Sequence, residues 1–224
     1  MSDKLSLILP GLVAVSSVVN WVAAWQWRLK TYYISKPLVM IFLIVFFILQ
    51  SPLTNQTIPF LSGLIFSLLG DVLLIPRGTR WFVAGMGSFS IAQLLYIVGF
   101  NLSPTSVPVT VISIFALLAG GLIIHLTVDI LAKSSSVNKE ILPLFKAYGI
   151  LVLGMAISAV VSIGRPAWSD MAAVMAGIGG ILFFTSDAMI ALDKLDRRLP
   201  KYKFWIILSY HIGQFFIVAA VLGL

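Results

Sequence analysis

Long apolar segments dominate this sequence and limit what it can fold into. Eight such runs lie at 5–24, 36–51, 58–76, 81–100, 107–128, 143–164, 169–191 and 203–223. A helix that crosses a bilayer needs about 20 mostly apolar residues. The second run is short for a span, so we expect its helix to extend into the flanking residues. The pattern predicts an all-α polytopic membrane protein, with residues 1–224 forming a single integral membrane domain of eight transmembrane helices.

The composition excludes several other classes of protein. Hydrophobic residues make up 60% of the chain and charged residues only 10%, whereas soluble domains carry roughly 25% charged residues. The absence of cysteine excludes disulfides, thiol nucleophiles and cysteine-ligated metals. Neither a P-loop nor a Rossmann glycine pattern is present, so we expect no cofactor.

Basic residues fall almost entirely on one side of the predicted membrane domain. The loops after the first, third, fifth and seventh runs, with the adjoining helix ends, hold 13 of the 15 lysines and arginines, and only Lys4 and Arg165 fall on the other side. Cytoplasmic loops of membrane proteins are enriched in lysine and arginine. This side is therefore predicted to be cytoplasmic, with both termini outside. The same rule explains the net charge of +7 without a nucleic-acid partner.

Two pairs of segments indicate a possible internal repeat. GLIFSLLGDVLLI (63–75) and GGILFFTSDAMIA (179–191) align without gaps and place Asp71 and Asp187 at the same position. The runs that follow them each carry one glutamine, Gln93 or Gln214. A duplicated four-helix unit in parallel orientation explains this match. Chance similarity between apolar helices is the alternative, because such helices share a small alphabet.

Asp71 and Asp187 are the two acidic residues that lie well inside apolar runs. An aspartate at the centre of a spanning helix costs about 2.5–3.5 kcal/mol on insertion scales, and such residues usually face the bundle interior and mark function. From the predicted helix ends, both should lie about 6–8 Å from the cytoplasmic end of their helices. The alternative is a buried carboxyl that is protonated or hydrogen-bonded between helices and has only a structural role.

Other polar residues occur in the same runs and are candidates for supporting or substrate-binding roles. We predict this role for Asn20, Lys36, Gln93, Tyr96, Tyr148, Ser186, His211 and Gln214. Most fall in the cytoplasmic half of the predicted bundle, with the two glutamines nearer its middle. Together they predict a polar chamber entered from the cytoplasm, with an apolar pocket above it.

His125 and Asp129 form a separate pair on one face of the fifth predicted helix, because they are four residues apart. Such a pair can be half of a metal site or a catalytic dyad. With His211 as the only other histidine, a zinc site would have too few ligands. We interpret the pair as an interfacial hydrogen bond and predict no metal.

Pairs of small residues in the runs predict close contacts between helices. They are Gly85 with Gly87, Gly120 with Gly121, and Ala173 with Gly177. Small residues let the backbones of membrane helices approach one another.

Two buried carboxyls without a metal or a nucleophile favour general acid/base hydrolysis. Burial and mutual repulsion keep one carboxyl protonated, so that it can act as an acid, while the ionised one holds and activates water. Such a pair suits acetal-like or vinyl ether bonds, which break through an oxocarbenium ion. The substrate of such a site would be a lipid from the cytoplasmic leaflet, and Lys36 could meet its phosphate.

The chain resembles the YhhN family of membrane proteins, which includes the lysoplasmalogenases. The resemblance rests on KPL (36–38), FSLLGDVLL (66–74), AQLLYIVGF (92–100), FFTSDAMIAL (183–192), and Tyr210 with Gln214. It implies an eight-helix bundle that hydrolyses the vinyl ether bond of lysoplasmalogens to a fatty aldehyde and glycerophospho-ethanolamine or -choline. It also implies that Asp71 and Asp187 are the key aspartates, and that the membrane is a bacterial inner membrane or the endoplasmic reticulum.

One position departs from the family pattern, since many relatives have histidine where this chain has Gln93. Glutamine can hydrogen-bond there but cannot shuttle a proton. Two other functions stay open on the sequence alone. Intramembrane aspartates also serve proton- or ion-coupled transporters, and a lipid-binding scaffold would need no catalysis.

Overall fold

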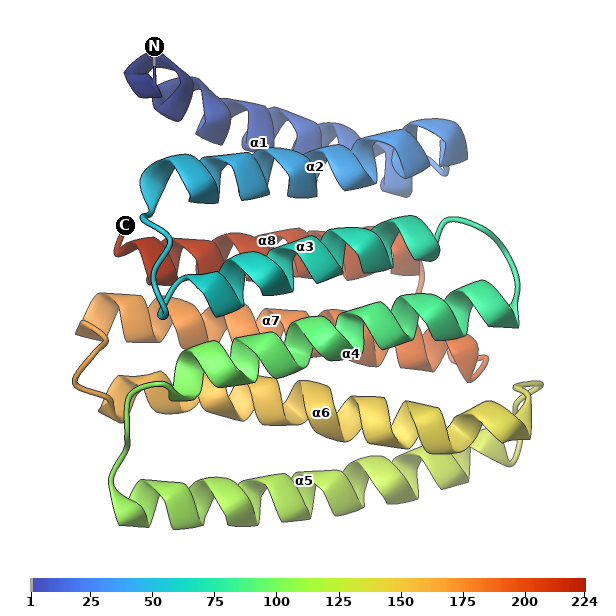
Figure 1. Cartoon of the computed structure of the whole chain (residues 1–224). Coiled ribbons are helices and arrows are strands. Elements are labelled where there is room, and N and C mark those ends of the chain that lie inside the picture. The colour runs from blue at the N-terminus through green and yellow to red at the C-terminus, as the bar shows by residue number, and fades with distance from the viewer. Residues whose placement is uncertain (1) are drawn as a thin grey trace.

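The described part of the chain folds into eight α-helices joined by short loops (Figure 1). A computed structural model describes residues 2–224, and within this range no strand is formed. The helices are α1 (Ser2–Trp25), α2 (Leu29–Gln50), α3 (Ile58–Leu73), α4 (Thr79–Asn101), α5 (Val107–Ala132), α6 (Leu142–Val160), α7 (Asp170–Lys194) and α8 (Tyr202–Leu222). Two 3₁₀ turns, η1 (Lys139–Ile141) and η2 (Val161–Gly164), flank α6. The predicted all-α class is confirmed.

Seven of the helices in residues 2–224 are long and apolar enough to cross a membrane, and α3 is shorter. With 16 residues, α3 is about 24 Å long. It begins with Pro59 in its first turn, where the missing N–H costs nothing. It ends at Leu73, three residues before Pro76, because a residue that precedes proline disfavours the helical conformation. The predicted third run to residue 76 was therefore too long as a helix.

The helix α2 begins seven residues before the predicted start at Lys36, which confirms the expected extension into its flank. Pro37 lies inside α2 rather than at its end. Lys36 therefore projects from the second turn of a continuous helix instead of from a loop, and this places its ammonium beside the neighbouring helices.

Successive helices run in opposite directions, so both termini lie at one end of the bundle (Figure 1, left). The loops that follow α1, α3, α5 and α7 gather at the opposite end, and they carry most of the basic residues. We call this the basic end. That the basic end is cytoplasmic stays a prediction from the distribution of charge.

Six helices pack around a common interior in the order α2, α3, α4, α6, α7 and α8. The helix α1 packs outside against α2 and α8, and α5 packs outside along α6. These two lie at opposite edges of the bundle (Figure 1). The interior contains large side chains that are almost fully buried, among them Phe47, Tyr96, Phe100 and Phe183. Most of the surface of α5 is exposed and apolar, as expected for a helix that faces lipid.

The two halves of the chain repeat one helix–helix contact, which supports the predicted duplication. A Cβ atom added at Gly63 of α3 would come within 2.3 Å of the Tyr96 ring on α4. At the aligned position in α7, a Cβ atom added at Gly179 would come within 2.8 Å of Ile217 on α8. In the alignment, Ile217 corresponds to Tyr96. The same close approach therefore joins α3 to α4 and α7 to α8.

Candidate active site

Asp71 is buried in the interior and held by two partners. Its carboxyl oxygens lie 2.9 Å from the Lys36 ammonium of α2 and accept a hydrogen bond of 2.9 Å from the Tyr210 hydroxyl of α8. The side chain is 1% exposed and that of Lys36 is 11% exposed. An ionised carboxyl in such a place requires an opposite charge and hydrogen bonds, and both are present. Lys36 is thereby engaged with a carboxylate rather than directed at the membrane surface, where we expected it to meet a phosphate.

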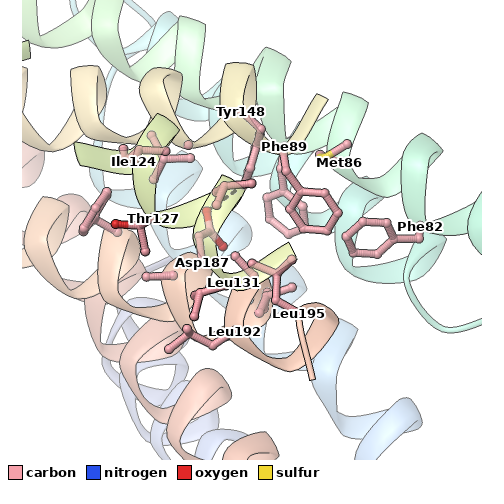
Figure 2. A pocket seen from close by; sticks show the side chains of 18 of the residues that line it. Phe82, Met86, Phe89, Ile124, Thr127, Leu131, Tyr148, Asp187, Leu192 and Leu195 are labelled. Carbon is pink, nitrogen blue, oxygen red and sulfur yellow. Dashed lines mark hydrogen bonds between the residues drawn. The ribbon is translucent and has the colours of Figure 1, made fainter. Parts of the chain in front are cut away.

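Asp187 has a different environment, because it lines a cavity. Its carboxyl accepts a hydrogen bond of 2.6 Å from the Tyr148 hydroxyl of α6. The cavity has a volume of about 300 Å³ and lies between α4, α5, α6 and α7, toward the basic end. Figure 2 shows Asp187 and Tyr148 pointing toward each other, with Phe89, Met86 and Phe82 in a row beside them. We call this the apolar cavity, since almost all of its other lining is hydrophobic.

The Asp71 cluster adjoins the apolar cavity through aromatic rings. The ring of Tyr210, whose hydroxyl binds Asp71, lies 6.0 Å from that of Phe89, which lines the cavity together with Asp187. The predicted depth was nevertheless wrong in detail. Asp71 lies two residues before the end of α3, and Asp187 lies seven residues before the end of α7. The helix α7 continues beyond the predicted end because Leu195, just after it, is fully buried and anchors the last turn.

Three buried side chains, Tyr96, Gln93 and Gln214, lie farther along their helices from the basic end than the two carboxyls do. The Tyr96 hydroxyl donates a hydrogen bond of 2.9 Å to Gln214. Gln93 is fully buried next to the Tyr148 hydroxyl, and its amide has no hydrogen-bond partner among the described residues. A buried amide of this kind can bind a water molecule or a polar group of a ligand.

Three of the predicted supporting residues make no hydrogen bond to either aspartate among the described residues. Asn20 donates hydrogen bonds to the Tyr32 carbonyl and the Ser35 hydroxyl, and so fastens α1 to α2. Ser186 donates to the Ile206 carbonyl and fastens α7 to α8. His211 faces α1, where its ring centroid lies 6.4 Å from that of Trp21. Asn20 and Ser186 therefore connect helices, whereas the buried ring nitrogens of His211 have no hydrogen-bond partner among the described residues.

The polar chamber that we predicted around the carboxyls is therefore a set of buried contacts, and the open space beside Asp187 is apolar. Only Asp187 of the two aspartates lines the apolar cavity. That cavity also extends to Leu195 and Phe82 at the basic end, and so does not lie above the carboxyls. The difference arises because Lys36 and Tyr210 fill the space around Asp71.

Sequence reasoning did not identify Tyr210 as a direct partner of Asp71. The sequence did contain a pattern that indicates such a role, since Tyr210 lies one helical turn before Gln214 and on the same face of α8. A charged or amide side chain in an apolar helix is unusual because its burial costs free energy, whereas tyrosine is tolerated in apolar surroundings. Tyrosine therefore stands out less.

The His125–Asp129 pair lies at the edge of the bundle, as interpreted from its spacing. The His125 Nε2 atom is 3.3 Å from Asp129, and the Lys146 ammonium is 2.6 Å from the same carboxyl. Both members of the pair are about half exposed. Asp129 thus joins α5 to α6 at their interface.

The fold and these contacts define a polytopic membrane protein with a buried Lys–Asp–Tyr cluster beside a carboxyl-lined apolar cavity. Comparison with known proteins agrees with this class. The model of the YhhN family matches residues 31–221, and the chain belongs to the YhhN family.

Curated relatives are named as lysoplasmalogenases. Human lysoplasmalogenase TMEM86B is 28% identical over 173 residues, which cover 77% of this chain and 67% of that protein. Bovine lysoplasmalogenase TMEM86A is 28% identical over 156 residues, which cover 69% of this chain and 61% of that protein. The chain thus spans about three fifths to two thirds of the length of these relatives. No solved structure gives a significant match.

Proposed function

We propose that this protein hydrolyses the vinyl ether bond of lysoplasmalogens within the membrane. The observation that carries the proposal is Asp187, a carboxyl held by Tyr148 at the side of an otherwise apolar cavity. A vinyl ether needs a proton donor in a place that also accepts its hydrocarbon chain, and the cavity offers both. The names of the relatives point to the same substrate class. The products would be a fatty aldehyde and glycerophospho-ethanolamine or -choline.

The two aspartates have different surroundings, and we propose different roles for them. Asp71 lies against the Lys36 ammonium, which favours its ionised form. Asp187 has only the Tyr148 hydroxyl as a hydrogen-bond partner among the described residues, and it faces hydrocarbon. We therefore assign Asp187 as the general acid, with the proton on the oxygen that Tyr148 does not bind.

The proposed reaction returns Asp187 to its starting form. Asp187 donates its proton to the vinyl carbon remote from the ether oxygen, which leaves an oxocarbenium ion and an Asp187 carboxylate. Water attacks the cationic carbon and gives a proton to this carboxylate. In the resulting hemiacetal, the carbon–oxygen bond to glycerol breaks, the glycerol oxygen gains a proton from Asp187, and the hemiacetal hydroxyl returns one to Asp187.

Asp71 acts in this proposal through its neighbours, since it does not line the cavity. The Lys36 ammonium stabilises the Asp187 carboxylate that forms in the first step. The Asp71 carboxylate compensates the charge of Lys36, so that the oxocarbenium ion does not form beside an unbalanced cation. Gln93 is buried next to Tyr148 and does not line the cavity, so we assign it the role of fixing the Tyr148 hydroxyl.

The experiment is a measurement of aldehyde release by the purified protein from lysoplasmenylethanolamine. The saturated 1-O-alkyl analogue serves as the control lipid, because it lacks the double bond to be protonated. We expect aldehyde from the first lipid only. We also expect a loss of about 10²–10⁴-fold in Asp187→Asn, the usual contribution of a general acid. Full activity in Asp187→Asn would overturn the assignment, and lipid binding without aldehyde would favour a transporter or scaffold.

A further inference from the structure

A second cavity lies at the basic end and is lined mainly by polar groups. It has a volume of about 330 Å³ and is formed by the loop before α4, the loop between α5 and α6, and the end of α7. Phe82 lines this cavity and also the apolar cavity. We call it the polar cavity. The two spaces are thus neighbours that share one aromatic side chain, with Asp187 in the apolar one.

Some charged residues of the polar cavity already have an ion-pair or hydrogen-bond partner, and one does not. Asp193 lies 2.6 Å from the Arg198 guanidinium. Asp196 accepts two hydrogen bonds of 2.7 Å from the backbone N–H and the hydroxyl of Ser136. Lys194, in contrast, has no carboxylate partner in the part of the chain that the structure describes. Its ammonium lies 4.5 Å from the centroid of the Phe82 ring. Its charge is therefore available at the junction of the two cavities.

The geometry of α7 fixes the direction and the distance between Lys194 and Asp187. They are seven residues apart, so both project from the same face of the helix, about 10 Å apart along its axis. In a lysoplasmalogen, the glycerol carbons and one phosphoester oxygen separate the vinyl ether from the phosphorus. The spacer is short, and the long, flexible lysine side chain can bring its ammonium to a phosphate held one to two helical turns from Asp187.

From these observations we infer that the two cavities form one site for a single-chain zwitterionic phospholipid. The hydrocarbon chain lies in the apolar cavity and the headgroup lies in the polar cavity. The phosphate binds Lys194 beside Phe82, and the headgroup amine lies near the carboxylates of Asp193 and Asp196. This inference rests on the proposed function for the position of the vinyl ether, but headgroup binding by Lys194 can be measured without turnover.

The test compares binding of two non-cleavable lipids to the full-length protein in nanodiscs. One probe is 1-O-hexadecyl-glycerophosphoethanolamine, and the other is 1-O-hexadecylglycerol, which lacks the phosphate. We expect Lys194→Gln to weaken binding of the first probe about tenfold, the loss of one charge-assisted contact, and to leave binding of the second unchanged. Lys194→Arg should restore binding. Lys30→Gln is the control, because Lys30 is exposed at the same end of the bundle but lines neither cavity.

Turnover then separates this inference from the proposed function. With lysoplasmenylethanolamine, Lys194→Gln should raise KM about tenfold and change kcat less than twofold. If no aldehyde forms but Lys194→Gln still weakens binding of the phosphate-containing probe alone, the proposed hydrolysis is wrong and the headgroup site is supported. Equal loss for both probes, or unchanged binding of the phosphate-containing probe, would overturn the headgroup site.

Discussion

The Lys36 ammonium lies 2.9 Å from an Asp71 carboxyl oxygen, and this pair joins α2 to α3 in the interior of the bundle. Removal of one partner would leave the other as an unpaired charge in a place with little access to water. We therefore expect Lys36→Met or Asp71→Leu alone to lower the free energy of unfolding by about 3–5 kcal/mol. The double variant should regain most of this stability, because neither charge remains. Equilibrium unfolding in mixed micelles measures all three.

Activity should respond differently from stability in the same variants. The double variant lacks the ammonium that stabilises the Asp187 carboxylate, so its aldehyde release should stay low after its stability has recovered. If the double variant recovers both its stability and its aldehyde release, the Lys36–Asp71 pair has only a structural role. A double variant less stable than either single one would contradict the described contact.

Tyr148 holds Asp187 through a hydrogen bond of 2.6 Å. In Tyr148→Phe the ring still packs but the donated bond is lost, and Asp187 is no longer fixed against the substrate. We expect kcat for aldehyde release to fall about tenfold or more, since misplacement by about 1 Å can cost 10²-fold. Tyr33→Phe is the matched control, because the Tyr33 ring packs on Tyr32 away from the cavity. An unchanged kcat in Tyr148→Phe would exclude the positioning role.

Asp196, in the loop after α7, holds the loop between α5 and α6 through Ser136. The two hydrogen bonds donated by Ser136 lower the pKa of Asp196 below its ordinary value of 3.8. Because the folded-state pKa is depressed, the contact stabilises the loop at neutral pH and loses its contribution as the pH falls through 3.8 and below. Amide hydrogen exchange in residues 133–138 should therefore be faster in Asp196→Asn than in the unmodified protein at pH 7. The difference should vanish in acid, and a difference that persists there would contradict the linkage.

The spans and the two aspartates could be predicted because the membrane imposes simple requirements. A spanning helix must be long and apolar, and a carboxyl within it must face the interior. These two rules located the helices and placed Asp71 and Asp187 inside the bundle. They also favoured the extension of α2 beyond a run that was too short on its own.

The rotation of each helix could not be predicted, because an apolar helix in lipid has no polar stripe that marks its outer face. Tyr210 and His211 illustrate this. They are adjacent in α8, yet the first reaches Asp71 and the second packs beside Trp21 on α1. An apolar pocket was predicted, but its position beside Asp187 was not, since it depends on how α5 packs along α6 rather than on any one segment.

The matched glycines Gly63 and Gly179 allow a test of the repeated helix contact. Alanine at either position would place a Cβ atom within 3 Å of the Tyr96 ring or of Ile217, where neighbours are tightly packed. We expect each substitution to cost about 1–3 kcal/mol of stability through overpacking.

Gly87→Ala is the control, because nothing lies within 4 Å of its added Cβ and alanine favours a helix by about 0.5–1 kcal/mol. Gly87 was predicted, together with Gly85, to allow a close contact between helices, but of these two glycines only Gly85 approaches α3. In detergent, the midpoint temperature of unfolding should therefore be higher for Gly87→Ala than for the unmodified protein, and well below it for Gly63→Ala and Gly179→Ala. If Gly63→Ala and Gly179→Ala were as stable as Gly87→Ala, the close contact that relates the two halves of the chain would be wrong.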